Sequence, residues 1–139
     1  MRIAFVGCGG IADHYLSVYR DTEWVEVVTC VDADHARAER AAAMLGDSPF
    51  GKPKPRAAGD FADAVSADVA LVVFNTPNHL HREQAVAALE AGKHVLLQKP
   101  VAATLADAEA IARAASEARR RTAGAPSLST SEVRTFTVP

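Results

Sequence analysis

A glycine-rich segment near the N-terminus constrains the fold of this chain more than any other feature. Residues 7–12 read Gly-Cys-Gly-Gly-Ile-Ala and match the pattern G-x-G-x-x-G/A. The apolar run Ile3-Ala4-Phe5-Val6 precedes the segment and predicts a buried strand that ends at the glycines. After the segment, apolar residues recur at the spacing of one helical face, at Ala12, Tyr15, Leu16 and Tyr19. We therefore expect the chain to pass from a strand through a tight turn directly into a helix.

Three further apolar runs predict strands in the rest of the chain. They span residues 25–31, 69–74 and 93–97, and they are rich in valine or leucine, as strands buried on both faces are. The segments that follow them have helical periodicity, and the last helix is expected to reach about Ala118. The expected caps are Asp34, Asn78 and Thr104 at helix N-termini and Gly46 and Gly92 at C-termini.

Residues 47–60 interrupt this alternation. They contain three prolines and two glycines, which predict a loop with at most a short edge strand. Strands separated by helix-length segments cannot pair as hairpins, so the pattern predicts a parallel sheet with right-handed crossovers. The fold class is therefore α/β, with helices on both faces of the sheet.

An acidic residue, Asp32, ends the second predicted strand. It lies about 20 residues after the glycine-rich segment, which is the spacing of the ribose-binding acid in dinucleotide-binding folds. The glycines alone would also fit an ordinary turn, and Asp32 alone would also fit a cap of the next turn. Together, in the order strand, turn, helix, strand and acid, they predict a Rossmann-like doubly wound sheet of about five strands in the order 3-2-1-4-5.

Each position of the glycine-rich segment has a physical role in such a site. Gly7 permits the tight turn, Gly9 lets the backbone approach a pyrophosphate, and Ala12 lets the helix pack closely on the strand. The N–H groups at the start of the helix, around Gly10 and Ile11, would face the anion.

The same acid predicts which dinucleotide is preferred. A carboxylate at Asp32 accepts hydrogen bonds from the adenosine ribose hydroxyls, whereas the 2′-phosphate of NADP would meet like charge. We therefore expect NAD, with NADP less favoured, although the nearby Arg37 and Arg40 are able to accommodate a phosphate.

Composition excludes several other classes of protein. The 139 residues fit one domain, and a formal net charge of -2 supplies no basic surface for nucleic acid or for an anionic membrane. Cys8 and Cys30 lack the close spacing of a metal or redox site, so we expect free thiols and no metal. No apolar stretch has the length of a signal-peptide core or a membrane span, and the expected location is the cytoplasm.

The C-terminal part of the sequence changes character after Arg121. We expect residues 1–121 to form the dinucleotide-binding domain and residues 122–139 to be a poorly specified tail. Within the tail, residues 133–138 alternate weakly and are open to a sixth strand, but a frayed terminus is the favoured interpretation.

Two polar segments follow the third and fourth apolar runs. They are Asn75-Thr76-Pro77-Asn78-His79-Leu80-His81 and Gln98-Lys99-Pro100. Because the C-terminal ends of parallel strands meet at one edge of a sheet, both segments should lie beside the glycine-rich turn and Asp32. A lysine at that edge can hydrogen-bond a substrate oxygen as hydride and proton leave.

With these segments, the chain resembles over residues 1–121 the N-terminal domain of the glucose-fructose oxidoreductase/inositol dehydrogenase/rhizopine-catabolism (Gfo/Idh/MocA) family. The resemblance implies that Lys99 points toward nicotinamide and substrate and polarises the substrate oxygen. It also implies a cis peptide bond between Lys99 and Pro100. The cofactor-contacting residues that it implies are Gly7, Gly9, Gly10, Ile11, Ala12, Asp32, Asn75, Thr76, Pro77, Asn78, His81, Gln98 and Lys99.

The sequence departs from the family pattern in two ways. Gln98 stands where the family usually has glutamate, which removes a charge next to Lys99. Residues 122–139 do not resemble the continuation of the family, which carries a second domain with the substrate pocket. Such an end is what a truncation, a frameshift or a domain fragment would produce, and we expect a homo-oligomer or a partner that supplies a second domain.

The leading hypothesis is an NAD(P)-binding domain of an oxidoreductase that transfers a hydride between nicotinamide and a small sugar-like or polyol substrate. Alone, this chain is expected to bind cofactor without efficient turnover. An alternative is a stand-alone dinucleotide-binding or interaction module without catalysis. A methyltransferase using S-adenosylmethionine also has a glycine-rich turn and an acid after the second strand, but Thr76-Pro77 and Lys99-Pro100 argue against it.

Overall fold

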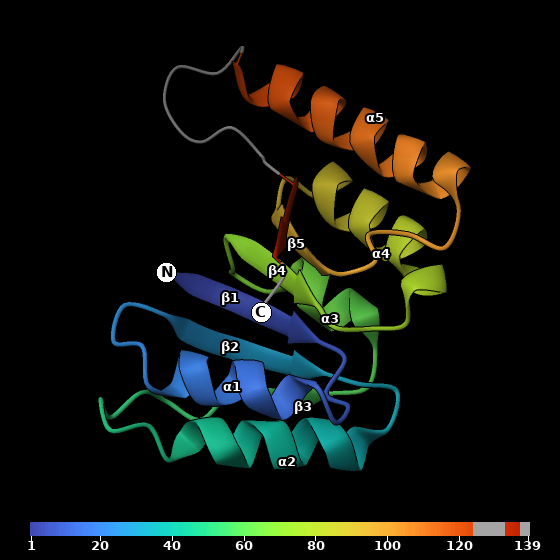
Figure 1. Cartoon of the computed structure of the whole chain (residues 1–139). Helices are drawn as coiled ribbons and strands as arrows, with labels where there is room; N and C mark the ends of the chain where they lie inside the picture. The colour runs from blue at the N-terminus through green and yellow to red at the C-terminus, as the bar shows by residue number, and fades with distance from the viewer. Residues whose placement is uncertain (124–132, 137–139) are drawn as a thin grey trace.

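The computed structural model describes residues 1–123 and 133–136, with side chains through residue 119. These residues form a sheet with the strand order β3-β2-β1-β4-β5-β6, in which every neighbouring pair is parallel (Figure 1). The strands are β1 (Arg2–Val6), β2 (Glu26–Val31), β3 (Arg56–Ala58), β4 (Leu71–Phe74), β5 (His94–Gln98) and β6 (Val133–Phe136). The helices are α1 (Ala12–Arg20), α2 (His35–Gly46), α3 (Phe61–Ser66), α4 (Asn78–Glu90) and α5 (Leu105–Ala123). The predicted α/β class and the order 3-2-1-4-5 are confirmed.

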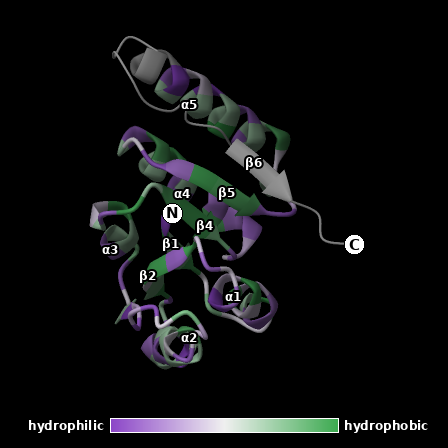
Figure 2. Cartoon of the chain, turned by 90° about the vertical axis from the view of Figure 1, so that its left-hand side faces the viewer, coloured by the Kyte–Doolittle hydropathy of each residue, from purple (hydrophilic) through white to green (hydrophobic). Residues whose placement is uncertain are grey.

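The helices cover the sheet from both sides, and each side has its own core. Helices α1 and α2 pack on one face, around Phe5, Leu16 and Cys30, whereas α3 and α4 pack on the other, around Phe74 and Leu89 (Figure 1). Helix α5 lies against α4. Figure 2 shows hydrophobic residues concentrated in the strands, while the helices alternate between hydrophobic and hydrophilic positions. The apolar runs of the sequence are therefore the buried layer between two helical layers.

Most expected helix ends are found in the structure. Asp34 caps α2 by accepting a hydrogen bond from the Ala36 N–H at 3.1 Å. The Asp107 N–H donates to the Thr104 hydroxyl at the start of α5, and Gly92 follows α4 with a φ of 77°. Helix α5 extends beyond the expected end near Ala118, as far as Ala123.

Two expected caps are wrong by one position. The N-cap of α4 is Pro77, so Asn78 is the first helical residue and α4 has no side-chain cap bond. Proline already has the φ that a helix start requires, so the helix begins without help from a side chain. The C-cap of α2 is Asp47, and Gly46 is the last helical residue.

Two segments contain a helix or a strand that differs from the prediction made from the sequence. Residues 47–60 contain the short edge strand β3, as expected, but they are followed by α3, which periodicity did not indicate because it is only six residues long. Residues 133–136 form β6 in register with residues 95–98 of β5, so the favoured frayed terminus is wrong for these four residues. The exposed edge of β5 offers unpaired backbone groups, and a β-prone segment satisfies them. The rest of the predicted tail, residues 124–132 and 137–139, lies outside the described residues.

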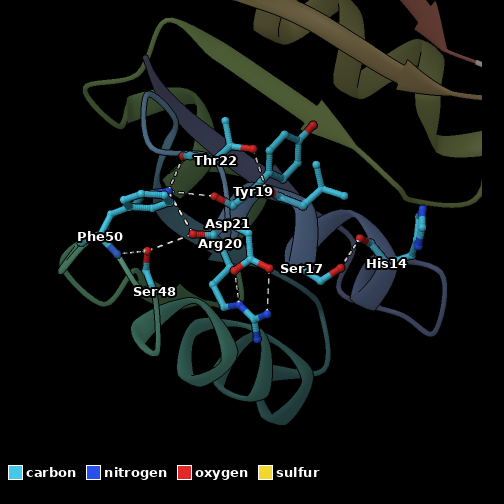
Figure 3. Close-up of polar contacts among 10 residues, drawn as sticks. His14, Ser17, Tyr19, Arg20, Asp21, Thr22, Ser48 and Phe50 are labelled. Carbon is cyan, nitrogen blue, oxygen red and sulfur yellow. Dashed lines mark hydrogen bonds and ion pairs between the residues drawn. The ribbon is translucent and has the colours of Figure 1, made fainter.

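The end of α1 is fastened to the loop after α2. The Ser48 hydroxyl donates to the Arg20 carbonyl at 2.9 Å, and the Arg20 guanidinium pairs with Asp21 (Figure 3). The Lys52 ammonium donates to the same carbonyl and to those of Tyr19 and Thr22, at 2.5–3.2 Å. These donors add to the backbone bonds at the end of α1, where the Tyr19 and Thr22 carbonyls also accept the N–H groups of Thr22 and Val25. They hold the C-terminal end of α1, so the helix presents its N-terminal end at the opposite edge of the sheet.

Among the described residues, none of the helices combines the length and the apolar character needed to cross a membrane.

Candidate dinucleotide-binding site

A cavity of about 700 Å³ lies at the C-terminal edge of the sheet. Because all strand pairs are parallel, the loops that leave β1, β2, β4 and β5 meet there. Of the predicted cofactor-contacting residues, all except Gly10 and Ala12 line this cavity. Ala12 is instead the fully buried first residue of α1, where its small side chain lets the helix pack on the sheet.

The glycine-rich turn has two positions that a side chain would disturb in different ways. Gly7 has a φ of 90°, and a Cβ atom there would lie 2.7 Å from the backbone of Asn75 and Thr76. This position therefore requires glycine for the turn itself and for the close approach of the loop after β4. A Cβ atom at Gly9 would meet no atom within 4 Å, so it would project into open space. Gly9 consequently leaves room for a ligand against the backbone, as a pyrophosphate requires.

The start of α1 lies beside this open space. Ile11 occupies its N-cap position and is 53% exposed, and no side chain caps the helix. The Ala12 N–H donates to the Gly9 carbonyl at 2.9 Å. No side chain caps the first turn of α1, and the acidic residue of that turn, Asp13, pairs with Arg40, which fits an anion at this end of the helix.

Asp32 connects the end of β2 to the glycine-rich turn. Its Oδ2 accepts a hydrogen bond from the Cys8 N–H at 2.7 Å, and its Oδ1 accepts one from the Asp34 N–H at 2.9 Å. The turn-capping alternative is therefore part of its role. A carboxylate has about four lone-pair positions, so two acceptor positions are left for ribose hydroxyls. The side chain lines the cavity, so these positions are within reach of a ligand.

The two arginines near Asp32 have different surroundings. The Arg40 guanidinium contacts Asp13 at 2.6 Å and donates to the Cys8 carbonyl at 3.0 Å. Arg37 lines the cavity, and its Nε lies 3.2 Å from the Asp34 carboxylate. Arg37, and not Arg40, is therefore the arginine that lines the cavity together with Asp32.

The turn after β4 is held by side chains of α4. The Thr76 hydroxyl donates to the Gln84 Oε1 at 2.7 Å. His81 is 1% exposed, and its ring nitrogens lie 2.9 Å from the Thr76 carbonyl and 3.2 Å from the Val101 carbonyl. Asn75 is the one described residue with a buried side-chain nitrogen or oxygen, its Nδ2, that has no hydrogen-bond partner. A donor of this kind at the cavity fits a ligand that supplies an acceptor.

Lys99 is exposed at the cavity, and its peptide bond to Pro100 is cis, as the resemblance implied. The Gln98 side chain holds the backbone before it. Its amide oxygen accepts a hydrogen bond from the Lys99 N–H at 2.8 Å, and its amide nitrogen donates to the Tyr15 hydroxyl. The amide therefore links α1 to the loop that carries Lys99. Glutamate, the usual family residue, would accept at both contacts, so Tyr15 would have to be the donor.

Some residues at the cavity were not predicted from the sequence. Gly59, in the loop between β3 and α3, and Phe61, the first residue of α3, line it. Asp60, which caps α3, is a local sequence signal for that helix. Gln84 also lines the cavity, but no sequence pattern distinguishes it from other polar residues of α4.

A second hollow, of about 330 Å³, lies between α1 and the strands β4 and β5. Its lining is mainly apolar and aromatic, and it includes Tyr15, Val18, Tyr19, Val73 and Leu96. It contains no glycine-rich backbone and no cation, so it lacks the groups that would bind a diphosphate. The cavity at the strand ends is therefore the better candidate for the dinucleotide site.

The parallel sheet, the glycine-rich turn and Asp32 define the class of dinucleotide-binding Rossmann domains. The model of the oxidoreductase family with an NAD-binding Rossmann fold matches residues 1–124. The chain belongs to this family, Gfo/Idh/MocA, and the resemblance noted from its sequence is confirmed. A nicotinamide dinucleotide is thus the cofactor class of the domain.

Relatives with known names are dehydrogenases and reductases. The chain is 34% identical over 118 residues to 4-carboxy-2-hydroxymuconate-6-semialdehyde dehydrogenase of a Sphingobium species, and 46% identical over 117 residues to 1,5-anhydro-D-fructose reductase of Ensifer adhaerens. Each match covers 84% of this chain, and 35% and 33% of the respective relatives. The chain therefore spans about a third of the length of these relatives.

Solved structures show the same relation. The WlbA dehydrogenase from Bordetella pertussis, solved with NADH and UDP-GlcNAcA, matches with a TM-score of 0.74 and 27% identity over 85% of this chain and 35% of its own. A 3-ketoreductase from Actinomadura kijaniata, solved with NADP, matches with a TM-score of 0.71 and 28% identity over 84% of this chain and 35% of its own. These neighbours contain both kinds of dinucleotide.

Proposed function

We propose that this chain is the cofactor-binding domain of an oxidoreductase that transfers a hydride between nicotinamide and a carbon atom of a sugar-like or polyol substrate. The observation that carries the proposal is the meeting of three groups at one cavity. These groups are the open backbone at Gly9, the Asp32 carboxylate and the Lys99 side chain. Gly9 would hold the pyrophosphate, Asp32 would bind the adenosine ribose, and Lys99 would face the reacting end.

The residues of this chain have distinct tasks in the proposed reaction. The bound cofactor supplies the site that accepts or releases hydride. The Lys99 ammonium would donate a hydrogen bond to the substrate oxygen and stabilise negative charge that develops there. The hydrogen bond from the Lys99 N–H to the Gln98 side-chain oxygen would fix where the lysine leaves the strand. The Asn75 amide would donate to an acceptor on the ligand.

The substrate class and the source of the substrate pocket are also proposals. Among the relatives, one is named a 1,5-anhydro-D-fructose reductase and another an inositol 2-dehydrogenase, which supports a sugar-like or polyol substrate. Because the chain spans about a third of these relatives, we propose that substrate-binding groups come from outside residues 1–139, from another part of the protein, a second copy or a partner. The described free thiols, Cys8 and Cys30, support a location in the reducing cytoplasm.

Calorimetry on the 139-residue chain tests cofactor binding directly. We expect NAD⁺ to bind and S-adenosylmethionine to show no heat of binding at the same concentrations. If S-adenosylmethionine binds and NAD⁺ does not, the proposal is contradicted and the methyltransferase alternative is supported.

A dinucleotide-binding module without catalysis is the second candidate, because the open backbone at Gly9 and the Asp32 carboxylate at the cavity serve cofactor binding alone. Purification of the protein from its natural source distinguishes the two hypotheses. A catalytic domain in the same polypeptide or in a stoichiometric partner supports the oxidoreductase, whereas NAD⁺ binding by an isolated 139-residue chain supports the module.

A further inference from the structure

We propose that His81 is a positioning residue that couples the two loops on the nicotinamide side of the site, and that it acts through backbone carbonyls without touching the cofactor. The inference rests on the proposed function, because it assumes that Lys99 faces nicotinamide. It revises the role that the family resemblance implied for His81, which was a direct contact with the cofactor.

The geometry places His81 between two segments that are remote in sequence. The residue lies in the first turn of α4 and is 1% exposed. Its Nε2 lies 2.9 Å from the carbonyl of Thr76, in the turn after β4. Its Nδ1 lies 3.2 Å from the carbonyl of Val101, two residues after Lys99 in the loop that leaves β5. One buried ring thus contacts both loops.

The two loops form adjacent walls of the cavity. Strands β4 and β5 are parallel neighbours, with Phe74 opposite Leu97, so the loops leave the sheet side by side. Helix α4 follows directly from the first loop, and the His81 ring bridges from this helix to the second. The two ring nitrogens belong to one rigid plane and contact one carbonyl each. A displacement of either loop that moves the ring therefore changes its contact with the other loop.

The Lys99 backbone is consequently held on both sides. Before it, the Gln98 amide oxygen accepts the Lys99 N–H. After it, the His81 ring contacts the Val101 carbonyl. The Thr76 hydroxyl has a separate partner in Gln84, so the turn after β4 keeps one anchor when His81 is replaced. Loss of the ring should therefore loosen mainly the loop that carries Lys99.

The experiment compares two ligands on the 139-residue chain by calorimetry. NADH spans the whole site, whereas ADP-ribose contains the adenosine, the pyrophosphate and the second ribose but no nicotinamide. In His81→Leu the Kd for NADH should rise about tenfold, the effect of losing a hydrogen bond near a ligand, while the Kd for ADP-ribose should change less than about twofold. A merely structural role of His81 would weaken both ligands in the same proportion.

Two conservative variants and a control sharpen the comparison. Glutamine can place an amide nitrogen near the position of Nε2, and asparagine near that of Nδ1, so His81→Gln keeps a donor for Thr76 and His81→Asn keeps one for Val101. Because the Val101 contact holds the Lys99 loop, His81→Asn should restore NADH binding more fully than His81→Gln. The matched control is His79→Gln on the same helix turn, where the histidine is exposed, and it should leave both affinities unchanged.

A measurement on the unmodified chain does not depend on how the variants fold. The NMR resonances of the His81 ring should shift when NADH is added and shift clearly less when ADP-ribose is added. Equal shifts with both ligands, or equal losses of both affinities in the variants, would overturn the positioning role. Failure of the unmodified chain to bind either ligand would instead contradict the proposed function.

Discussion

At the scale of single residues, the site depends on groups that serve the fold and the ligand together. The Asp32 carboxylate accepts hydrogen bonds from the backbone N–H groups of Cys8 and Asp34, and its other acceptor positions are available at the cavity. Gly7 and Gly9 divide the same two tasks between them. The first makes the turn possible, and the second leaves space for a ligand.

Asp32 should select between the two dinucleotides. Charge-assisted hydrogen bonds to the ribose hydroxyls contribute about 1.5–3 kcal/mol, so NAD⁺ should bind roughly tenfold to a hundredfold more tightly than NADP⁺. Asp32→Ser should reduce this difference, because it removes the charge that repels the 2′-phosphate and leaves Arg37 at the cavity. Calorimetry with both dinucleotides measures the ratio. Equal or tighter NADP⁺ binding by the unmodified chain would refute the preference.

The two glycines should respond oppositely to substitution. Gly9→Val places a branched side chain in the open space, so it should abolish NAD⁺ binding with little change in Tm. Gly7→Ala must accommodate a Cβ atom 2.7 Å from backbone atoms at a φ of 90°, so it should lower the free energy of unfolding by more than about 1 kcal/mol. Thermal unfolding and calorimetry on both variants test the pair. Unchanged NAD⁺ affinity in Gly9→Val would mean that the segment is only a turn.

Cys30 should be an unreactive thiol in the folded chain. Its hydrogen bond with Cys8 and its burial raise its pKa above the usual value, so the folded protein keeps it protonated where an unfolded chain loses the proton. Its contribution to stability is therefore complete below the pKa of an unfolded cysteine, about 8.5, and declines as the pH rises above it. Iodoacetamide at pH 8.5 should modify Cys30 at least about tenfold faster in the unfolded than in the folded chain. Equal rates would show that the thiol is accessible and ionised in the fold.

At the scale of elements, helix ends decide where the site residues stand. Helix α1 begins at the cavity without a side-chain cap. At the opposite edge of the sheet it ends where the Lys52 ammonium donates hydrogen bonds to its last carbonyls and to that of Thr22. Helix α4 begins at Asn78 after Pro77, which places His81 in its first turn. The contacts at the far end of α1 and the start of α4 therefore help to set where the residues at the cavity lie.

The Lys52 contacts should stabilise the fold without affecting the site. Lys52→Met retains much of the side-chain volume but removes the donors to three carbonyls, so the free energy of unfolding should fall by about 1 kcal/mol for this partly exposed group. NAD⁺ affinity should stay the same, because the contacts lie at the far end of α1. Urea unfolding measures the first effect, and Lys54→Met, at an exposed lysine in the same loop, is the matched control. A loss equal to that of the control would show that the three contacts contribute nothing.

At the scale of the whole molecule, the chain corresponds to about a third of the length of its relatives and contains the cavity at the strand ends. The cavity is lined by segments that follow five strands of one sheet, and this gives it the groups for a dinucleotide. The relatives are about three times as long as the matched region, and the remaining two-thirds are where a substrate surface is to be sought.

A chimaera tests the proposed role of Lys99 at this scale. Residues 1–121 can be joined to the remaining part of 1,5-anhydro-D-fructose reductase, of which the match covers 33%. In this protein Lys99→Ala should lower turnover by about 10² to 10⁴, because a general acid or hydrogen-bond donor at the substrate oxygen is lost. NAD⁺ affinity should stay within a few fold, which separates the chemical step from binding. Full activity of the variant would refute the catalytic role.

The sequence alone was sufficient for the features that depend on neighbours in the chain. A strand, a glycine turn and a helix in succession predict the tight turn at Gly7, because φ is a local property, whereas the close approach of Gly7 to Asn75 and Thr76 joins remote segments. The position of Asp32 followed from the fixed length of one strand-helix-strand unit, and the sheet order followed from the alternation of strands and helices.

Other features depended on contacts between remote segments, which no local pattern records. Strand β6 forms because the edge of β5 is open, and α3 is too short to have a periodicity of its own. The His81 ring lies between Thr76 and Val101, and Gln98 lies between Tyr15 and Lys99, only after the strand ends have been brought together. The sequence thus determined the fold class and the order of the first five strands, since both follow from local geometry and order along the chain. Tertiary structure alone decided which side chains line the cavity and which hold its walls, because that depends on the distances between loops far apart in the sequence.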